Sequence, residues 1–455
     1  MLDKHSWLYW VHRLSPAQLL LLFYFIAIIG STTILSLPFV YKGDEMVPFI
    51  DILFTAVSTL TVTGLNTVSI SETFNTTGII ILTIIMHLGA VGVMAVSTMI
   101  WVLIGKRIGL SERRLIMQDQ NQTTFGGMVQ LIKQIIYLIL VVEVICIVLL
   151  GTYLLRYVDS VSEAYFQGYF TTITAMSNTG FSLDNNSLVM YSHDYFIQLV
   201  VMFLIVFGAI GFPVLIELKH FLFTRKQEKR SFRFSLFTKV TTTTFGGLII
   251  IGSLFIYLID MSGFFKDKNV LEGFFYALFQ SITTRSAGLS TMDITLLSET
   301  NHLFMSFLMF IGASPSSAGG GIRTTTFALV VIFMITFARG GKALKLFNRE
   351  IYEEDLMKAV SVTLMSIALV FFSLLIVTFI EPYSFITLWF EITSAFGTVG
   401  LSLGVTSELT TFSKLLLMVL MFIGRVGVVT FLFTFKKSVN HDNYIRYPKE
   451  RIIIG

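Results

Sequence analysis

The chain has 455 residues, of which 54% are hydrophobic and only 13% are charged, and its net charge is +4. A soluble domain carries roughly twice that charged fraction, so this composition excludes an ordinary soluble protein. The single cysteine, Cys146, lies in an apolar stretch; it excludes a framework of disulfides and is expected to pack in the core. The composition therefore indicates a polytopic membrane protein.

Eight apolar stretches follow one another along the chain. Each is long enough to cross about 30 Å of hydrocarbon as a helix, which takes roughly 20 residues. In chain order they are 17–38, 78–104, 133–155, 196–223, 240–262, 302–338, 359–380 and 412–435. We expect eight transmembrane helices from them.

Positively charged residues gather in alternate loops between these stretches. The groups are Lys106, Arg107, Arg113 and Arg114; Arg225, Lys226, Lys229, Arg230, Arg233 and Lys239; Arg339, Lys342, Lys345 and Arg349; and Lys436 with Lys437. Loops rich in lysine and arginine remain in the cytoplasm. We therefore expect a multi-pass protein of the bacterial cytoplasmic membrane with both termini inside. Topology accounts for these clusters, so no nucleic-acid partner is expected.

Four segments resemble one another and recur at a nearly constant spacing. They are 58–65 (STLTVTGL), 174–181 (TAMSNTGF), 282–289 (ITTRSAGL) and 394–401 (SAFGTVGL), and their glycines lie 116, 108 and 112 residues apart. An apolar run of about a dozen residues precedes each glycine and is too short to span a bilayer, so it is predicted to be a re-entrant helix. The chain then divides into four repeats, 1–110, 111–235, 236–350 and 351–455. Each repeat is a span, a re-entrant helix, a loop and a second span.

The expected fold is an all-α polytopic membrane protein with eight transmembrane helices and four re-entrant pore helices. The four repeats, each of M1-P-M2 type, would surround one pore with pseudo-fourfold symmetry. Non-helical backbone survives at membrane depth only where it is buried in protein or lines a water-filled cavity. Four such segments meeting on one axis could replace the hydration shell of an ion with backbone carbonyls.

The residue types in these segments suit a cation. Glycine reaches φ values that other residues avoid, which lets consecutive carbonyls point the same way, and the C-terminal ends of the re-entrant helices carry partial negative charge. The candidate cation-binding residues form four groups, one in each repeat, which are called loops 1 to 4. In chain order they are Thr61, Val62, Thr63 and Gly64; Asn178, Thr179 and Gly180; Ser286, Ala287 and Gly288; and Thr398, Val399 and Gly400.

A second glycine pattern follows each loop on the next span. The segments are Gly89–Gly92, Gly208–Gly211, Gly312–Pro315 and Gly424–Gly427. Glycines three apart on a membrane helix usually allow two helices to pack closely. Their equivalent position in the four repeats also favours a shared turn that faces the pore.

The stretch 302–338 contains the best candidate for a gate. As one helix it would run about 55 Å, nearly twice the hydrocarbon thickness. Its middle is the sequence Gly312, Ala313, Ser314, Pro315, Ser316, Ser317, Ala318, Gly319, Gly320 and Gly321, here called the gate loop, which is a poor helix former. We expect two helices joined by a flexible intramembrane loop below loops 1 to 4, the alternative being a static kink.

Arg425 is the second gate candidate because a charge in an apolar span is costly unless it faces water or a partner. Facing the pore, it would set a barrier to cations; alternatively it is structural, bonded to pore-helix carbonyls or to Glu391.

Two other polar residues lie at membrane depth. Glu143 is expected to have a buried partner or to lie near a dimer interface. His87 is expected to pack or to form hydrogen bonds, and neither residue is predicted to belong to a proton relay.

Two of the glycine segments and the C-terminal sequence resemble those of a known family. Residues 61–65 (TVTGL) and 397–401 (GTVGL) are similar to the filter loops of the Trk/Ktr/HKT superfamily of cation translocators, and the ending 443–448 (NYIRYP) with Gly455 resembles Ktr-type membrane subunits (KtrB- and KtrD-like). The resemblance covers essentially the whole chain. It implies potassium uptake through a gated pore, with the gate loop and Arg425 in gating roles. Gly64, where plant relatives with sodium preference carry serine, points to potassium.

The resemblance also implies partners. Ktr membrane subunits form homodimers on a cytosolic ring of RCK-type regulatory subunits (KtrA- and KtrC-like), and that ring, not the membrane subunit, binds nucleotides. No tightly bound cofactor is expected; K⁺ is the transported ion, Na⁺ is a candidate activator, and membrane lipid surrounds the protein. The loops 219–239 and 339–349 are candidate docking surfaces for the ring.

Loop 3 departs furthest from the filter pattern, because Arg285 precedes it and only the glycine is common to all four loops. This departure predicts weaker selectivity than a true potassium channel has and leaves a sodium-permeable translocator open. A membrane-embedded enzyme would need a nucleophile with a base or paired metal ligands, which the sequence does not offer. A secondary transporter of a small solute remains an alternative, although such folds usually have two repeats instead of four.

Overall fold

The computed structural model describes residues 14–43, 47–92, 128–223, 232–341, 343–434 and 450. Several sequence predictions fall outside these residues. They concern the basic groups at 106–114, 225–230 and 436–437, the residue Lys342, the second half of the span 78–104 and the C-terminal motif at 443–448 with Gly455. The remaining predictions can be compared with the structure.

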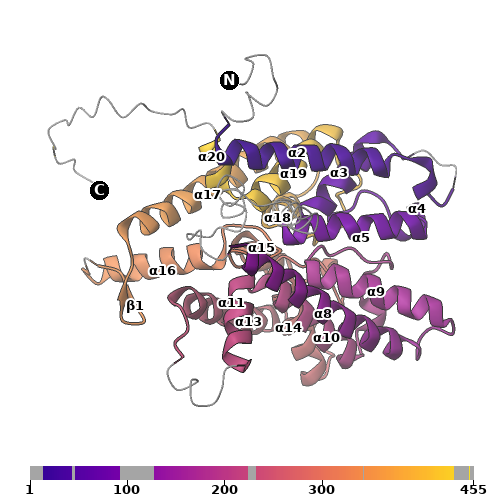
Figure 1. The fold of residues 1–455 in the computed structure, drawn as a ribbon, viewed down its shortest axis with the longest axis horizontal. Helices are drawn as coiled ribbons and strands as arrows, with labels where there is room; N and C mark the ends of the chain where they lie inside the picture. Colours follow the sequence, from indigo (N-terminus) through magenta and orange to yellow (C-terminus); the bar gives the residue numbers. More distant parts are fainter. Residues whose placement is uncertain are drawn as a thin grey trace.

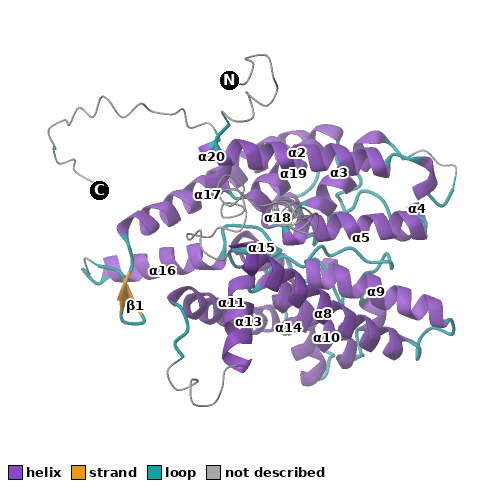
Figure 2. Ribbon diagram, viewed as in Figure 1, coloured by secondary structure: helices purple, strands orange, loops and turns teal. Residues whose placement is uncertain are grey.

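Helices make up nearly all of the described chain (Figure 2). The longer ones are α2 (Pro16–Leu35), α3 (Phe49–Leu60), α5 (Thr76–Val91), α8 (Met128–Leu154), α9 (Val161–Ser177), α10 (Tyr195–Ala209), α11 (Phe212–Phe223), α13 (Leu236–Ile259), α14 (Val270–Thr283), α15 (Glu299–Ile311), α16 (Thr324–Ala338), α17 (Glu353–Ile380), α18 (Phe385–Gly397) and α19 (Thr411–Val426). The short helices are α4 (Ile70–Thr73) and α20 (Val428–Phe433), with 3₁₀ turns at Pro38–Val40, Val189–Tyr191 and Ile294–Leu296. Between α16 and α17, β1 (Lys345–Leu346) and β2 (Arg349–Glu350) form a small antiparallel pair.

Four of the described helices are long and apolar enough to cross a membrane, namely α2, α8, α13 and α17. The pair α10 and α11 also qualifies together but is bent by 108° at its break. These helices agree with a polytopic membrane protein. The predicted spans 196–223 and 412–435 are each interrupted at a glycine, where the second glycine pattern favours a turn.

The second glycine pattern marks the breaks. Helix α5 ends at Gly92, α10 is separated from α11 at Gly211, and α19 is separated from α20 at Gly427, with φ values of +97°, +101° and +93°. In the third repeat, where proline replaces the second glycine, the break comes earlier, at Gly312 with φ +69°. Positive φ is incompatible with a continuing right-handed helix, so the helix stops there.

The first glycine of the pattern has a different role. A Cβ atom at Gly89, Gly208 or Gly424 would overlap a carbonyl oxygen at the C-terminal end of α3, α9 or α18, on Leu60, Met176 or Phe396 respectively. Each of these carbonyls lies four residues before the glycine of its loop. The first glycine therefore allows close packing of a span on its pore helix. Close packing is thus confirmed for the first glycine and a helix break for the second, whereas a position facing the pore stays a prediction.

The four helices that precede the loops, α3, α9, α14 and α18, begin at exposed or half-buried residues and end in the buried centre. Pro48 is the N-cap residue of the first of them, and serine caps α9 and α18 through Ser160 and Ser384. The hydroxyl-bearing residues near their C-terminal ends, such as Ser58, Thr174 and Ser394, are at most 1% exposed. A polar centre therefore lies inside an apolar shell.

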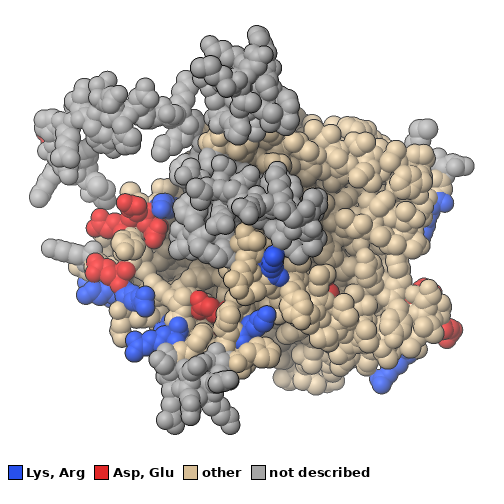
Figure 3. All heavy atoms as spheres, in the orientation of Figure 1, with Lys and Arg blue, Asp and Glu red and all other residues tan. Residues whose placement is uncertain are grey.

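The repeats pack side by side around that centre. In Figure 1 the helices run mostly along the long axis, with α2, α3 and α5 beside α17 to α19, and α8 to α11 beside α13 and α14. One apolar core joins the first group and another joins α8 to α11 with α14. The face in Figure 3 has a broad uncharged surface, and its charged side chains gather mainly near the end that carries β1. Large apolar side chains such as Phe379, which is 92% exposed, cover the outside, as lipid contact requires.

A buried ion pair joins the first pore helix to the last span. Asp51 Oδ1 lies 2.9 Å from Lys414 Nζ, and their side chains are 12% and 9% exposed. We expect Asp51→Asn to destabilise the protein by about 3 kcal/mol, because it leaves the lysine buried without a counter-ion. Thermal unfolding in detergent would measure this, and adding Lys414→Met should restore part of the loss.

The control for this prediction is the exposed pair formed by Lys358 and Asp355, whose side chains are 59% and 55% exposed. Lys358→Met should leave the midpoint temperature of unfolding nearly unchanged, because exposed ion pairs contribute little to stability. Equal losses from both substitutions would contradict the assignment of Asp51 as a buried anchor.

Candidate ion pathway and gate

The backbone of loops 1 to 4 has one unusual conformation repeated four times. The four glycines have φ values of +85°, +83°, +74° and +92° in chain order. The residue two positions before each glycine also has positive φ: Val62 at 58°, Asn178 at 58°, Ser286 at 84° and Thr398 at 49°. The residue between them does not. Alternating the sign of φ turns successive peptide groups so that their carbonyls face the same side, the arrangement that coordinates a cation.

The four loops meet in a closed ring. A Cβ atom on Gly64 would overlap the carbonyl oxygen of Thr179 in loop 2, and one on Gly180 would lie 2.6 Å from the carbonyl oxygen of Ala287 in loop 3. The same relation continues from loop 3 to the carbonyl of Val399 in loop 4 and from loop 4 to the carbonyl of Thr63 in loop 1. Each glycine therefore faces the residue before the next glycine, in cyclic order. Residues more than 300 positions apart in the sequence are brought into contact at this point.

Hydroxyl groups hold the loops in place. The N–H groups of Gly64 and Gly400 donate to Ser58 Oγ and Ser394 Oγ, at 3.0 Å and 3.1 Å, across the same six-residue interval. In loops 1, 2 and 4 the residue before the glycine donates its N–H to a carbonyl five residues earlier. In loop 3 the acceptor is only four residues earlier, on Thr283. The sequence departure at loop 3 is thus a departure in backbone geometry as well.

Arg285 is the side chain that accompanies this departure. It is completely buried, and its three guanidinium nitrogens have no hydrogen-bond partner among the described residues. It follows the C-terminal end of α14, where the helix dipole favours a cation. A fixed positive charge beside loop 3 lowers the electrostatic attraction of the ring for cations.

Two cavities lie on opposite sides of the ring and the gate loop. A cavity of about 430 Å³ is lined by the glycines of all four loops together with polar residues that follow them, among them Asn66, Ser182, Asp184 and Ser402. A second cavity, of about 640 Å³, is lined by residues of the gate loop and its neighbours, including Pro315, Gly321 and Gly427. One cavity thus adjoins the ring of loop glycines and the other adjoins the gate loop.

The gate loop is non-helical and buried, as the sequence predicts. Its backbone docks on the end of α10, where Ser314 and Ala318 donate to the carbonyls of Ala209 and Gly208, both at 3.0 Å. In return, Phe212 donates to the carbonyl of Ser316 at 2.8 Å. The two ends of the loop lie against each other, because Ala313 donates to the carbonyl of Gly320 at 3.1 Å. The loop is therefore compact, and backbone hydrogen bonds attach it to the end of α10 and the start of α11.

The side chain of Arg425 on α19 also binds the gate loop. Its guanidinium donates to the carbonyls of Ser317, Ala318 and Gly319 in the gate loop, and to those of Gly89 and Ala90 at the C-terminal end of α5. The partners proposed from the sequence, pore-helix carbonyls or Glu391, are therefore wrong. Glu391 instead accepts from Ser402, Leu403 and Thr406 and braces the segment after loop 4.

Arg323 is a residue of this site that the sequence analysis missed. Its guanidinium donates to the carbonyls of Ser314 and Gly319 in the gate loop and to the carbonyl of Arg425 at 3.2 Å. The available signal was a lone arginine two residues after three consecutive glycines inside an apolar stretch. Two arginines, one before α16 and one at the end of α19, thus clamp the same loop.

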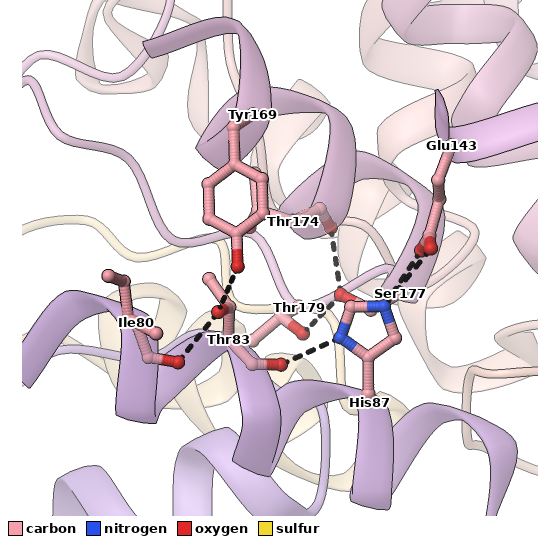
Figure 4. Close-up of polar contacts among 8 residues, drawn as sticks. All are labelled: Ile80, Thr83, His87, Glu143, Tyr169, Thr174, Ser177 and Thr179. Carbon is pink, nitrogen blue, oxygen red and sulfur yellow. Dashed lines mark hydrogen bonds and ion pairs between the residues drawn. The ribbon is translucent and has the colours of Figure 1, made fainter. Parts of the chain in front are cut away.

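His87 and Glu143 form a buried contact between α5 and α8, drawn in Figure 4. His87 Nε2 lies 3.0 Å from Glu143 Oε1, while Nδ1 lies 2.8 Å from the carbonyl oxygen of Thr83. Because that carbonyl only accepts, Nδ1 carries a proton, and a second proton lies between Nε2 and the carboxylate. Thr83 Oγ1 is also 2.8 Å from the hydroxyl of Tyr169 on α9.

This network confirms that His87 forms hydrogen bonds and gives Glu143, which is 6% exposed, a partner that is itself 30% exposed. Searching for ionisable groups along one helix could not pair them, since they lie on different helices. Together they tie α5 and α8 to the pore helix that ends at Ser177.

A ring of positive-φ glycines, a buried non-helical loop and an apolar outer surface agree with a polytopic membrane protein. The family model described as TrkH, cation transport protein, matches residues 16–447. The chain belongs to this family of cation transport proteins. Its class is therefore a transport protein and not an enzyme.

Individual relatives agree with this assignment. The chain is 50% identical over 445 residues to the Ktr system potassium uptake protein D of Bacillus subtilis, covering 98% of each chain. It is 35% identical to the Ktr system potassium uptake protein B of the same organism over the full length of both, and 30% identical to the potassium/sodium uptake protein NtpJ of Enterococcus hirae, covering 97% of this chain and 98% of that protein.

These relatives confirm the resemblance to Ktr-type membrane subunits. The crystal structure of the potassium transporter TrkH from Vibrio parahaemolyticus has the same fold, with a TM-score of 0.71 and 17% identity, covering 93% of this chain and 86% of that one.

Proposed function

We propose that the protein takes up potassium ions across the cytoplasmic membrane through a gated, channel-like pore. Loops 1 to 4 form its selectivity filter, and the gate loop with Arg425 forms its gate. The closed ring in which each positive-φ glycine faces the carbonyl of the next loop carries this proposal. Such a ring presents carbonyl oxygens from four sides to one dehydrated monovalent cation. The names of the relatives as potassium uptake proteins support the choice of ion.

The membrane arrangement follows from the same ring. Eight transmembrane helices and four re-entrant pore helices would form four repeats around one axis with pseudo-fourfold symmetry. The glycine breaks at equivalent positions and the four short helices that converge on the ring support this arrangement. Loops 1 to 4 would face outwards and the basic loops inwards, with both termini in the cytoplasm.

Regulation would come from other chains. We expect a homodimer on a cytosolic RCK-type ring, KtrA- or KtrC-like, that binds nucleotide, with Na⁺ as an influence on uptake. The described residues of the candidate docking loops include Arg339, Lys345 and Arg349, which lie next to α16. Because α16 begins directly after the gate loop and Arg323, a pull on α16 would act on the gate loop.

The test is ⁸⁶Rb⁺ uptake into potassium-loaded liposomes that contain the protein and its ring. External K⁺ should suppress uptake at far lower concentration than Na⁺ or Li⁺. Equal suppression by Na⁺ would reassign the protein as a sodium-permeable translocator, an alternative that the different backbone geometry of loop 3 favours. Competition by an organic solute would point to a secondary transporter instead.

A further inference from the structure

We propose that the side-chain oxygen of Ser286 and the carbonyl oxygen of Thr398 form an inner monovalent-cation site that is available only after the gate loop has left. This site rests on the proposed function and adds a direct link between gate and filter. Both residues hold the same place in their loops, two positions before the glycine, and both are completely buried.

The two residues are joined across neighbouring loops. Ser286 Oγ donates to the carbonyl oxygen of Thr398 at 2.6 Å and lies 3.0 Å from Thr398 Oγ1. The equivalent residue of loop 1, Val62, has no polar side chain and packs against Ala90 and Ala318. In loop 2, the side-chain amide of Asn178 is satisfied by Ile205, Ala175 and Ala209 of its own repeat. Only loops 3 and 4 therefore offer hydroxyl groups at this level of the ring.

The gate loop contacts this pair directly. Gly320 donates its N–H to Ser286 Oγ at 3.3 Å. A Cβ atom on Gly319 would lie 2.5 Å from Ser286 Oγ, and one on Gly320 would lie 2.6 Å from Thr398 Oγ1. The gate loop thus rests against the inner end of loops 3 and 4 without intervening space, which is why both positions are glycine.

The hydrogen bonds determine what these oxygens can do. A serine hydroxyl has one donor and two lone pairs. With the gate loop in place, the Ser286 proton points at the Thr398 carbonyl, one of its lone pairs accepts from the Gly320 N–H, and Gly319 and Gly320 fill the space beside both side chains, so a cation cannot reach the pair from the gate-loop side. Once the gate loop moves, Ser286 loses its donor from Gly320 and can change rotamer. Two oxygens of neighbouring loops then become cation ligands at the inner mouth of the filter.

The experiment compares Ser286→Ala in two backgrounds, the full chain and a chain lacking residues 313–320, which removes the Gly320 donor and can be closed because Gly312 also lies against Gly321. In the shortened chain we expect the ⁸⁶Rb⁺ concentration for half-maximal uptake to rise at least threefold, because a ligand has been lost. In the full chain without the ring we expect basal uptake to rise, because the gate loop has lost an anchor. Ser286→Gly should have the same two effects as Ser286→Ala. Glycine adopts a φ of +84° without strain, so this variant shows that the effects do not come from misfolding.

Ser306→Ala is the matched control, because it removes a buried hydroxyl that donates to the carbonyl of His302 on α15. Ser306→Ala should change neither the ⁸⁶Rb⁺ concentration for half-maximal uptake in the shortened chain nor the basal uptake of the full chain. Unchanged half-maximal concentration in both Ser286 variants of the shortened chain would overturn the inner site alone. Absence of any ⁸⁶Rb⁺ uptake by the shortened chain with Ser286 intact would reject the proposed function and this site together.

Discussion

Gly64→Ala is expected to abolish discrimination between K⁺ and Na⁺, lowering the selectivity ratio at least tenfold. The φ of +85° is the smaller part of the reason. Such a conformation costs an L-residue about 1–2 kcal/mol, and Val62, only two residues away, already adopts one. The decisive effect is steric, because the new Cβ atom would overlap the carbonyl oxygen of Thr179. That oxygen belongs to the ring itself, so the substitution must displace a cation ligand.

The measurement is ⁸⁶Rb⁺ uptake with K⁺ and Na⁺ as competitors. Gly247→Ala is the control, because a Cβ atom there meets nothing within 4 Å. It should keep the native selectivity and, as an alanine within α13, should fold normally. A Gly64→Ala protein that still excludes Na⁺ as well as the native chain does would contradict the assignment of loop 1 to the filter.

Deleting residues 313–319 is expected to raise ⁸⁶Rb⁺ uptake without the regulatory ring by at least about tenfold. The gate loop is held by backbone bonds to Gly208, Ala209 and Phe212 and by the Arg425 guanidinium. Each such bond contributes roughly 0.5–1.5 kcal/mol, and 1.4 kcal/mol corresponds to a factor of ten. Removing several together should therefore shift the pathway strongly towards the open state.

The structure makes this deletion feasible. Gly312 and Gly320 lie against each other, so they can be joined without moving α15 or α16 apart. Selectivity provides the internal control, because the deletion removes no residue of loops 1 to 4 and the extra uptake should still prefer K⁺ over Na⁺. Combining the deletion with Gly64→Ala should give high but unselective flux. Uptake no higher than that of the intact chain would refute the gate loop as a gate.

Local sequence features determined much of this protein. Hydropathy placed the long spans, because every backbone group in lipid must be satisfied within a helix. The recurrence of four glycine segments located the ring, since positive φ at a fixed place in a repeat leaves glycine as the preferred residue. The glycine-rich composition of 312–321 located the gate loop, because such a sequence cannot remain helical.

Tertiary structure alone decided which groups meet. The partners of Arg425, the clamp by Arg323, the pairing of His87 with Glu143 and the bond between Ser286 and Thr398 all join residues from different helices or loops. Charge and periodicity along one segment say that a polar group needs a partner but not which one. That choice depends on how the four repeats close around the ring, which places residues 102 to 336 positions apart in hydrogen-bond contact at the gate.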